Sequence, residues 1–361
     1  MASHSLSIGR KFIVFLVAVT LPFLLVEGTA SLFMAVQQTA VAPMPSHARY
    51  DEELGWICRP NVRIDSLYGP GLGLTTNAQG LRAKESYTPA VPPGRFRVIC
   101  LGDSFTQGYG VSDEETYPAQ MEAACPRVQA INMGQVGYGI DQAYLWYKRD
   151  GAKLQADVLL FAFINNDFWR MSISAFRGYP KPMLRARGGQ LHLENVPVPR
   201  RWAGAAARRR AMELVRGLAV TRSAYWLKER LVSKPDLPAT TAHGATFYQP
   251  SNEDTLAAAG LVFQDLARLS KERGQQLVLV YLPSDLVIEP SVEAQWLTEF
   301  ARTHDLRLFN LVAEFGRLPP WELARLFLPH GHYTREGNRL VAEAMLRRLR
   351  DLNPPPPDCP R

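Results

Sequence analysis

Cysteine is scarce in this chain, and no arrangement typical of a metal site is present. The 361 residues include four cysteines, Cys58, Cys100, Cys125 and Cys359. They show neither a CxxC spacing nor a histidine at the spacing of a zinc site, so the cysteines give no sign of a metal site. Cys58 and Cys359 lie outside the predicted core, so an oxidising compartment would let them form a disulfide.

Motifs for binding nucleic acid are also missing. The net charge of +7 and the isoelectric point near 9.3 are compatible with an anionic partner. Much of the excess, however, lies in one arginine-rich run at 200–210, without a zinc-finger, RRM or helix-turn-helix pattern. Such a run is typical of a solvated helix face, or of contact with anionic lipid headgroups or an acidic substrate. We therefore expect no nucleic-acid partner.

Only one hydrophobic run is long enough to span a bilayer, at 12–35, directly after Arg10 and Lys11. A spanning helix needs about 20 residues, and the basic flank predicts that residues 1–11 stay in the cytosol. The sequence thus predicts a single-pass transmembrane helix that anchors the chain in the membrane, with the body extracytoplasmic, in a periplasm. The alternative is a signal peptide cleaved after Ala30, which would release a secreted protein.

Strands and helices alternate along most of the remaining chain, from 95 to 350. Apolar runs predict strands, and amphipathic segments predict helices between them. Short connections between alternating elements indicate an α/β domain with a parallel sheet covered by helices on both faces. The strands are expected at 96–101, 128–133, 157–164, 276–282 and 307–311, and the helices at 117–124, 140–149, 254–274, 291–304 and 334–349.

Three segments interrupt or flank this pattern. An insertion is predicted at 168–254, with a hairpin around 188–193. A loop-rich connector at 36–94 contains Trp56, which would be costly to leave in water, so the connector is expected to pack on the main domain. The last segment, 351–361, is a proline-rich tail.

Polar residues and glycines follow three predicted strands and precede the last helix. Gly102-Asp103-Ser104 ends the first strand, a glycine-rich stretch at 134–139 follows the second, and Asn166 follows the third. His332 stands just before the last helix. Since the carboxyl ends of parallel strands meet at one edge of the sheet, these groups are expected to lie together. Acyl transfer needs this set, because it takes a nucleophile, donors for the oxyanion and a base.

In these four blocks the chain resembles the SGNH/GDSL hydrolase superfamily. Ser104 matches the nucleophile block, Gly137 the glycine block, Asn166 the asparagine block and His332 the histidine block, in the family's order. Four blocks in one order are far more specific than any one of them. The resemblance covers about 95–349, apart from the insertion.

The N-terminal part resembles membrane-anchored bacterial members of that superfamily. In these, one helix is followed by a Leu-Gly-Trp segment and a Thr-Asn-x-x-Gly-x-Arg segment, which stand here at 54–56 and 76–82. The resemblance implies the SGNH hydrolase fold, a flavodoxin-like three-layer α/β/α sandwich with a parallel sheet, preceded by one transmembrane helix.

The resemblance also implies an extracytoplasmic serine esterase or acylhydrolase. Ser104 would attack an ester carbonyl while His332 takes its proton and later gives it to the leaving alcohol. The oxyanion would be held by the backbone N–H groups of Ser104 and Gly137 and by the Asn166 side chain, and no metal or cofactor is required. The substrate would be an ester-bearing small molecule, a lipid or an O-acylated glycan.

Two positions depart from the family pattern. The asparagine block begins with Ile164 instead of glycine. The aspartate that usually precedes the histidine by two or three residues is missing, since His330 stands there and no carboxylate occurs between Glu322 and His332. A backbone carbonyl or a distant carboxylate would then orient His332. Asp103 and His330 are the candidate supporting residues, and His330 is also a substitute base.

Two other functions fit the same blocks. An O-acyltransferase to an envelope polysaccharide would share the acyl-enzyme and differ only in the acceptor, a sugar hydroxyl instead of water. The missing aspartate would also suit a non-catalytic module that binds envelope glycans or a partner. Catalysis predicts that Ser104 Oγ lies within about 3.2 Å of a ring nitrogen of His332.

Overall fold

The computed structural model divides the chain into two compact units, residues 1–43 with 201–243, and residues 44–200 with 244–361. It describes residues 44–200, 251–284, 291–352 and 355, and only positions 9, 14–22, 24, 25 and 28 before them. No helix formed by these described residues is long and apolar enough to cross a bilayer. Several predictions concern segments that lie largely or wholly outside the described residues: the anchor at 12–35, the arginine run at 200–210, Cys359 and the tail at 351–361.

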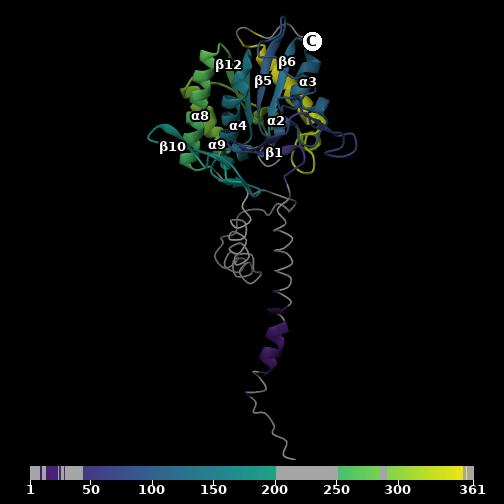
Figure 1. Cartoon of the computed structure of the whole chain (residues 1–361), viewed down its shortest axis with the longest axis vertical. Helices are drawn as coiled ribbons and strands as arrows, with labels where there is room; N and C mark the ends of the chain where they lie inside the picture. The colour runs from purple at the N-terminus through teal and green to yellow at the C-terminus, as the bar shows by residue number, and fades with distance from the viewer. Residues whose placement is uncertain are drawn as a thin grey trace, which may run out of the picture. The chain divides into compact units, whose positions relative to one another are not determined.

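Five parallel strands form the sheet of the second unit, in the order β13-β12-β7-β5-β6 (Figure 1). Numbered along the chain, this order is 2-1-3-4-5 from the β6 edge, which is the predicted flavodoxin-like arrangement. All five predicted strands are thus confirmed. Their bounds are β5 Phe96–Gly102, β6 Val128–Gly134, β7 Val158–Phe163, β12 Gln276–Tyr281 and β13 Arg307–Asn310.

Helices cover both faces of the sheet, because alternate strand residues point to opposite faces and both sets are apolar. In β7, Leu159 and Phe161 join one buried cluster, whereas Val158 and Leu160 join the other. The first cluster includes residues of α4 (Ile140–Arg149), α5 (Asn165–Met171), α8 (Glu253–Glu272) and α9 (Val292–Thr303). The second includes residues of α2 (Ser104–Gln107), α3 (Tyr117–Ala124), α10 (Val312–Phe315) and α12 (Arg335–Leu349).

The structure differs from the prediction after β7. Ile164 was expected to end the strand, but it is the N-cap of α5, and this helix runs into the predicted insertion. The Asp167 carboxylate accepts the backbone N–H of Ile164 at 3.0 Å, so a local side-chain contact starts the helix. Within the insertion the predicted hairpin is confirmed, as β10 (Met183–Arg187) pairs with β11 (Gln190–Glu194), after the short pair β8 (Ala175–Phe176) and β9 (Tyr179–Pro180).

The connector packs on the sheet domain through a small set of apolar side chains. Leu54, Trp56, Ile57 and Leu81 are buried in the same cluster as α4 and α8. The elements of the connector are short antiparallel pairs, β1 (Ala48–Asp51) with β2 (Gly55–Cys58), and β3 (Arg63–Ile64) with β4 (Leu74–Thr75). The remaining short helices of the unit are the 3-10 turns Asp113–Glu115 and Gly151–Lys153, and α11 (Pro320–Arg325).

The pairing of Cys58 with Cys359 that the sequence allowed does not form. Cys58 is a free thiol, 3% exposed in β2, and burial raises its pKa to about 11. The side-chain amide of Gln107 donates to its sulfur at 3.3 Å, so this thiol is enclosed by polar contacts. Cys125 is disulfide-bonded instead.

Candidate active site

Ser104 stands where β5 ends and α2 begins. Asp103 is the N-cap of this helix, and its Oδ1 accepts the backbone N–H of Phe105 at 2.8 Å. Gly102 is required because a Cβ there would lie 2.4 Å from the carbonyl oxygen of Ala162 in β7. Ser104 itself begins the helix, so its backbone N–H has no intrahelical partner. The turn therefore offers a hydroxyl and an N–H donor at the carboxyl edge of the sheet.

His332 reaches Ser104 from the loop that precedes α12. Its Nε2 lies 2.8 Å from Ser104 Oγ, within the distance expected from the sequence. The His332 carbonyl accepts the backbone N–H of Leu328 at 2.6 Å, which closes the loop. The imidazole stacks on the ring of Phe105, with ring centroids 4.9 Å apart. Packing and backbone contacts thus hold the ring in place against the serine.

The other ring nitrogen of His332 faces a second histidine. The Nδ1 atoms of His330 and His332 lie 3.1 Å apart, so a second imidazole faces this nitrogen. No carboxylate among the described residues forms a hydrogen bond with the His332 ring. If Nε2 of neutral His332 is to accept the Ser104 proton, Nδ1 must carry the ring proton and donate it to His330. His330 then keeps its own proton on Nε2.

The surroundings of His332 favour its neutral form. Burial is the main cause that lowers its pKa, to about 4, while His330 and Arg170 lower it further and the Asp103 carboxylate opposes them. A neutral imidazole is the form that can accept a proton from Ser104. His332 is therefore neutral, and able to act as a base, at pH values above about 4.

Arg170 joins two carboxylates beneath the nucleophile, and the sequence analysis did not single it out. Its Nη1 donates to Asp103 Oδ2 at 3.0 Å and also bonds to Asp167. Burial and the neighbouring Asp103 raise the pKa of Asp167 well above its ordinary value, although Arg170 opposes this shift. The spacing of Asp167 and Arg170, three residues apart on one helix, was the available sequence signal.

The three predicted oxyanion donors follow adjacent strands. In the sheet register Gly102 pairs with Gly134 of β6 and with Ala162 of β7, so the loops after these strands leave the edge side by side. Gly137 lies in the loop after β6 at φ +80°, a conformation that favours glycine. Asn166 lies in the first turn of α5, and its half-buried amide forms no hydrogen bond with the described residues. Both follow strands that neighbour β5, so both remain the predicted oxyanion donors.

The departure at Ile164 leaves the backbone of this block undisturbed. Ile164 has φ −107° and ψ 170°, an extended conformation that any residue adopts, so glycine is not needed. The preceding amide, Asn165, turns toward the loop after β12, where its Oδ1 accepts a 3.5 Å hydrogen bond from Ser284. Ser104 follows β5, on the other side of β7 from β12. Asn166 therefore remains the candidate donor.

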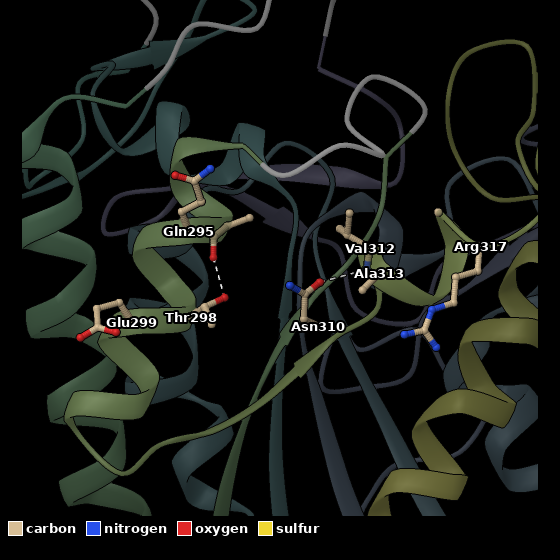
Figure 2. A pocket seen from close by; sticks show the side chains of 9 residues that line it. Gln295, Thr298, Glu299, Asn310, Val312, Ala313 and Arg317 are labelled. Atoms are coloured by element: carbon tan, nitrogen blue, oxygen red, sulfur yellow. Dashed lines mark hydrogen bonds between the residues drawn. The ribbon is translucent and has the colours of Figure 1, made fainter.

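A separate pocket of about 580 Å³ lies at the β13 end of the sheet. Figure 2 shows Asn310 of β13 between Thr298 of α9 and Arg317. None of its lining residues belongs to the Ser104 site, which lies three strands away. Among the described residues, no three His, Cys, Asp or Glu side chains are grouped as metal ligands would be.

Comparison with known proteins gives similarities to solved structures only, since no protein-family model and no curated protein matches the chain. A member of the lipolytic protein G-D-S-L family from Veillonella parvula is 13% identical, with a TM-score of 0.39 over 71% of this chain and 100% of that one. The lipase/acylhydrolase from Enterococcus faecalis is 14% identical, with a TM-score of 0.38 over 73% and 100%. The acetylxylan esterase Axe2 from Geobacillus stearothermophilus is 13% identical, with a TM-score of 0.39 over 71% and 95%. Similarity at this level carries no argument about the activity, which rests on the geometry of the site.

Proposed function

We propose that this chain is a serine esterase or acylhydrolase that works through an acyl-enzyme. One observation carries the proposal, the 2.8 Å contact between Ser104 Oγ and His332 Nε2 at the carboxyl edge of a parallel sheet. Two further features support it, the helix-terminal N–H of Ser104 and the Asn166 amide in the first turn of α5, which forms no hydrogen bond with the described residues. These groups supply a nucleophile, a base and donors for a developing oxyanion.

The proposed reaction has two halves that share one proton carrier. Ser104 Oγ attacks the ester carbonyl while its proton passes to His332 Nε2, and the N–H groups of Ser104, Gly137 and Asn166 receive the negative oxygen. His332 then gives the proton to the departing alkoxide, which leaves as the alcohol. In the second half His332 takes a proton from water, the hydroxide attacks the acyl-enzyme, and Ser104 regains its proton as the acid leaves.

His330 positions the base in this scheme, without touching the substrate. Its Nδ1 lone pair receives the Nδ1–H of His332, which selects the tautomer with Nε2 free. An imidazole carries no negative charge, so it stabilises the imidazolium formed during catalysis less than a carboxylate would. The Asp103 carboxylate acts on His332 electrostatically and favours its charged form.

Covalent labelling tests the proposal. Incubation of the purified full-length chain with a fluorophosphonate, followed by mass spectrometry of its peptides, is expected to find the label on Ser104 alone. Labelling is expected to disappear after heat denaturation, because it needs the folded site. A folded chain that takes up no fluorophosphonate would contradict the esterase and favour the non-catalytic binding module.

The variant His330→Asp is expected to raise kcat for a model ester roughly tenfold, because a carboxylate stabilises the imidazolium better than a neutral ring. The same negative charge raises the pKa of His332 above its present value of about 4. Since only neutral His332 accepts the serine proton, the acid limb of the pH profile of kcat/KM then moves to higher pH. His192→Asp, at an exposed position of β11, is the matched control and leaves the limb in place. An unshifted limb in His330→Asp would overturn the role given to His330.

We propose further that the catalytic unit works outside the cytosol, behind the N-terminal anchor at 12–35. The disulfide at Cys125 supports this location, because disulfides persist in oxidising compartments. A periplasmic reporter fused after residue 40 is expected to be active in a bacterial host, and a cytosolic reporter at the same point to be inactive. The opposite pattern would place the body in the cytosol.

A further inference from the structure

The loop that carries Gly137 is held by the connector as well as by its own strand. The indole Nε1–H of Trp56 donates to the carbonyl of Val136 at 2.9 Å. The hydroxyl of Tyr138 donates back to the Trp56 carbonyl at 2.5 Å, so the loop is tied on both sides of Gly137. The backbone N–H of Cys58 adds a 3.0 Å bond to the side-chain carbonyl of Gln135.

The bond from Trp56 fixes the peptide between Val136 and Gly137, which carries one of the proposed oxyanion donors. The Val136 carbonyl and the Gly137 N–H belong to the same planar peptide unit and point in opposite directions. Holding the carbonyl oxygen at Trp56 therefore sets the direction of the Gly137 N–H. A Cβ at Gly137 would lie 3.4 Å from the Trp56 ring and 2.8 Å from that of Phe176, so these two rings leave no room for a side chain there.

A second connector residue holds the turn that follows the nucleophile helix. Arg82 is buried, and its Nη1 donates to the carbonyls of Gln107 at 2.7 Å and Gly108 at 2.6 Å. Its Nη2 donates to the carbonyl of Val111 at 2.8 Å. Carbonyls at the end of a helix have no intrahelical partners, so one guanidinium satisfies the end of α2 and fixes it. The Arg82 charge is paired with Asp113 at 2.8 Å.

We propose that the connector at 44–94 is part of the catalytic apparatus, with Trp56 as the positioning residue for the oxyanion donor Gly137 and Arg82 as the positioning residue for the Ser104 turn. The inference rests on the proposed esterase function and adds two residues to it. From the sequence, these segments were expected only to pack on the main domain. Their contacts, however, end on the two loops that the reaction uses.

The variant Trp56→Phe keeps an aromatic ring and removes the indole N–H, together with part of the ring volume; a matched Trp→Phe change elsewhere measures the cost of the lost volume. It is expected to lower kcat for a model ester roughly tenfold with KM nearly unchanged, since a misdirected donor weakens stabilisation of the transition state. Hydrogen exchange of the Gly137 amide is expected to become faster. Trp296→Phe, the same change in a half-buried ring on α9, is the matched control and alters neither quantity.

The effect of Trp56 is also expected to depend on the rest of the oxyanion site. In Asn166→Ala, which loses a second donor, adding Trp56→Phe is expected to lower kcat by a factor different from tenfold, because both changes act on one oxyanion.

Arg82→Lys keeps the positive charge but loses the fork of guanidinium donors, and a roughly tenfold lower kcat is expected. Arg97→Lys is its control, since Arg97 is also buried but stands near the start of β5, at the opposite end of the strand from Ser104, and donates to the carbonyls of Thr88 and Gln155.

The outcomes separate this inference from the proposed function. If the wild-type chain is labelled at Ser104, but Trp56→Phe matches it in kcat and in Gly137 exchange, the inference is overturned and the esterase stands. If the wild-type chain is not labelled, the esterase fails, and the exchange rate of Gly137 still shows whether Trp56 orders the loop. Equal losses of kcat in Arg82→Lys and Arg97→Lys would reduce Arg82 to a structural role.

Discussion

Replacing Ser104 by alanine is expected to lower kcat for ester hydrolysis by about 10⁶-fold and to abolish fluorophosphonate labelling. The hydroxyl is the atom that becomes acylated, and no second hydroxyl among the described residues bonds to a ring nitrogen of His332. The remaining rate comes only from substrate binding and the oxyanion donors. Steady-state kinetics with a chromogenic ester, together with the intact mass of the chain after labelling, measure both effects.

The matched variant for this experiment is Ser104→Cys. It keeps a nucleophile at the same atom position, and its sulfur still faces His332. We expect the introduced thiol to react with an alkylating reagent, whereas the buried Cys58 and Cys100 stay unmodified in the folded chain. Ester hydrolysis that survives in Ser104→Ala at more than about a thousandth of the wild-type rate would remove Ser104 from the role of nucleophile.

Replacing His332 by alanine is expected to cost about 10⁵-fold in kcat, because Ser104 then loses its imidazole base. The Asp103 carboxylate, which accepts from Ser104 Oγ at 3.3 Å, is held by Arg170 and is a poor substitute. The double variant with Ser104→Ala is expected to be no slower than either single variant, since the two residues act as one unit. Kinetics of all three variants measured side by side give this comparison.

Added imidazole provides the control for the His332 variant. The removed ring leaves a space beside Phe105 and Tyr109, against which it packs at centroid distances of 4.9 and 4.8 Å. Imidazole in solution is expected to restore part of the lost rate in His332→Ala and none in Ser104→Ala. If His330→Ala instead showed the loss of about 10⁵-fold and His332→Ala did not, His330 would be the base.

The strands and most helices were predictable because each depends on the pattern of apolar residues within its own segment. An apolar run such as 158–163 is buried on both faces, and the apolar stripe of α12 repeats every three to four residues. The short helix α2 was missed, since four residues give no periodicity and its start depends on the Asp103 cap. The start of α5 was missed for a related reason. Its N-cap, Ile164, follows directly on a strand, and the start depends on the Asp167 carboxylate that accepts the Ile164 N–H.

The partner of His332 needed the folded loop. The sequence shows two histidines two residues apart and no acid nearby, which left a backbone carbonyl, a distant carboxylate or a supporting histidine open. Gly331, at φ +82°, makes the turn that brings the two Nδ1 atoms together. The orientation of the His330 and His332 imidazoles across this turn cannot be predicted from the local sequence.

The sequence by itself predicted the parallel sheet, the strands that form it and the positions of Ser104, Gly137 and Asn166 after those strands, because periodicity and glycine positions are properties of neighbouring residues. Only the tertiary structure decided that Trp56 bonds to Val136, 80 positions away, and that Arg82 bonds to the end of α2. Such contacts form when distant segments are packed together, and their hydrogen bonds depend on orientations that neither segment contains alone. The residues of the reaction were therefore visible in the sequence, but the residues that position them were not.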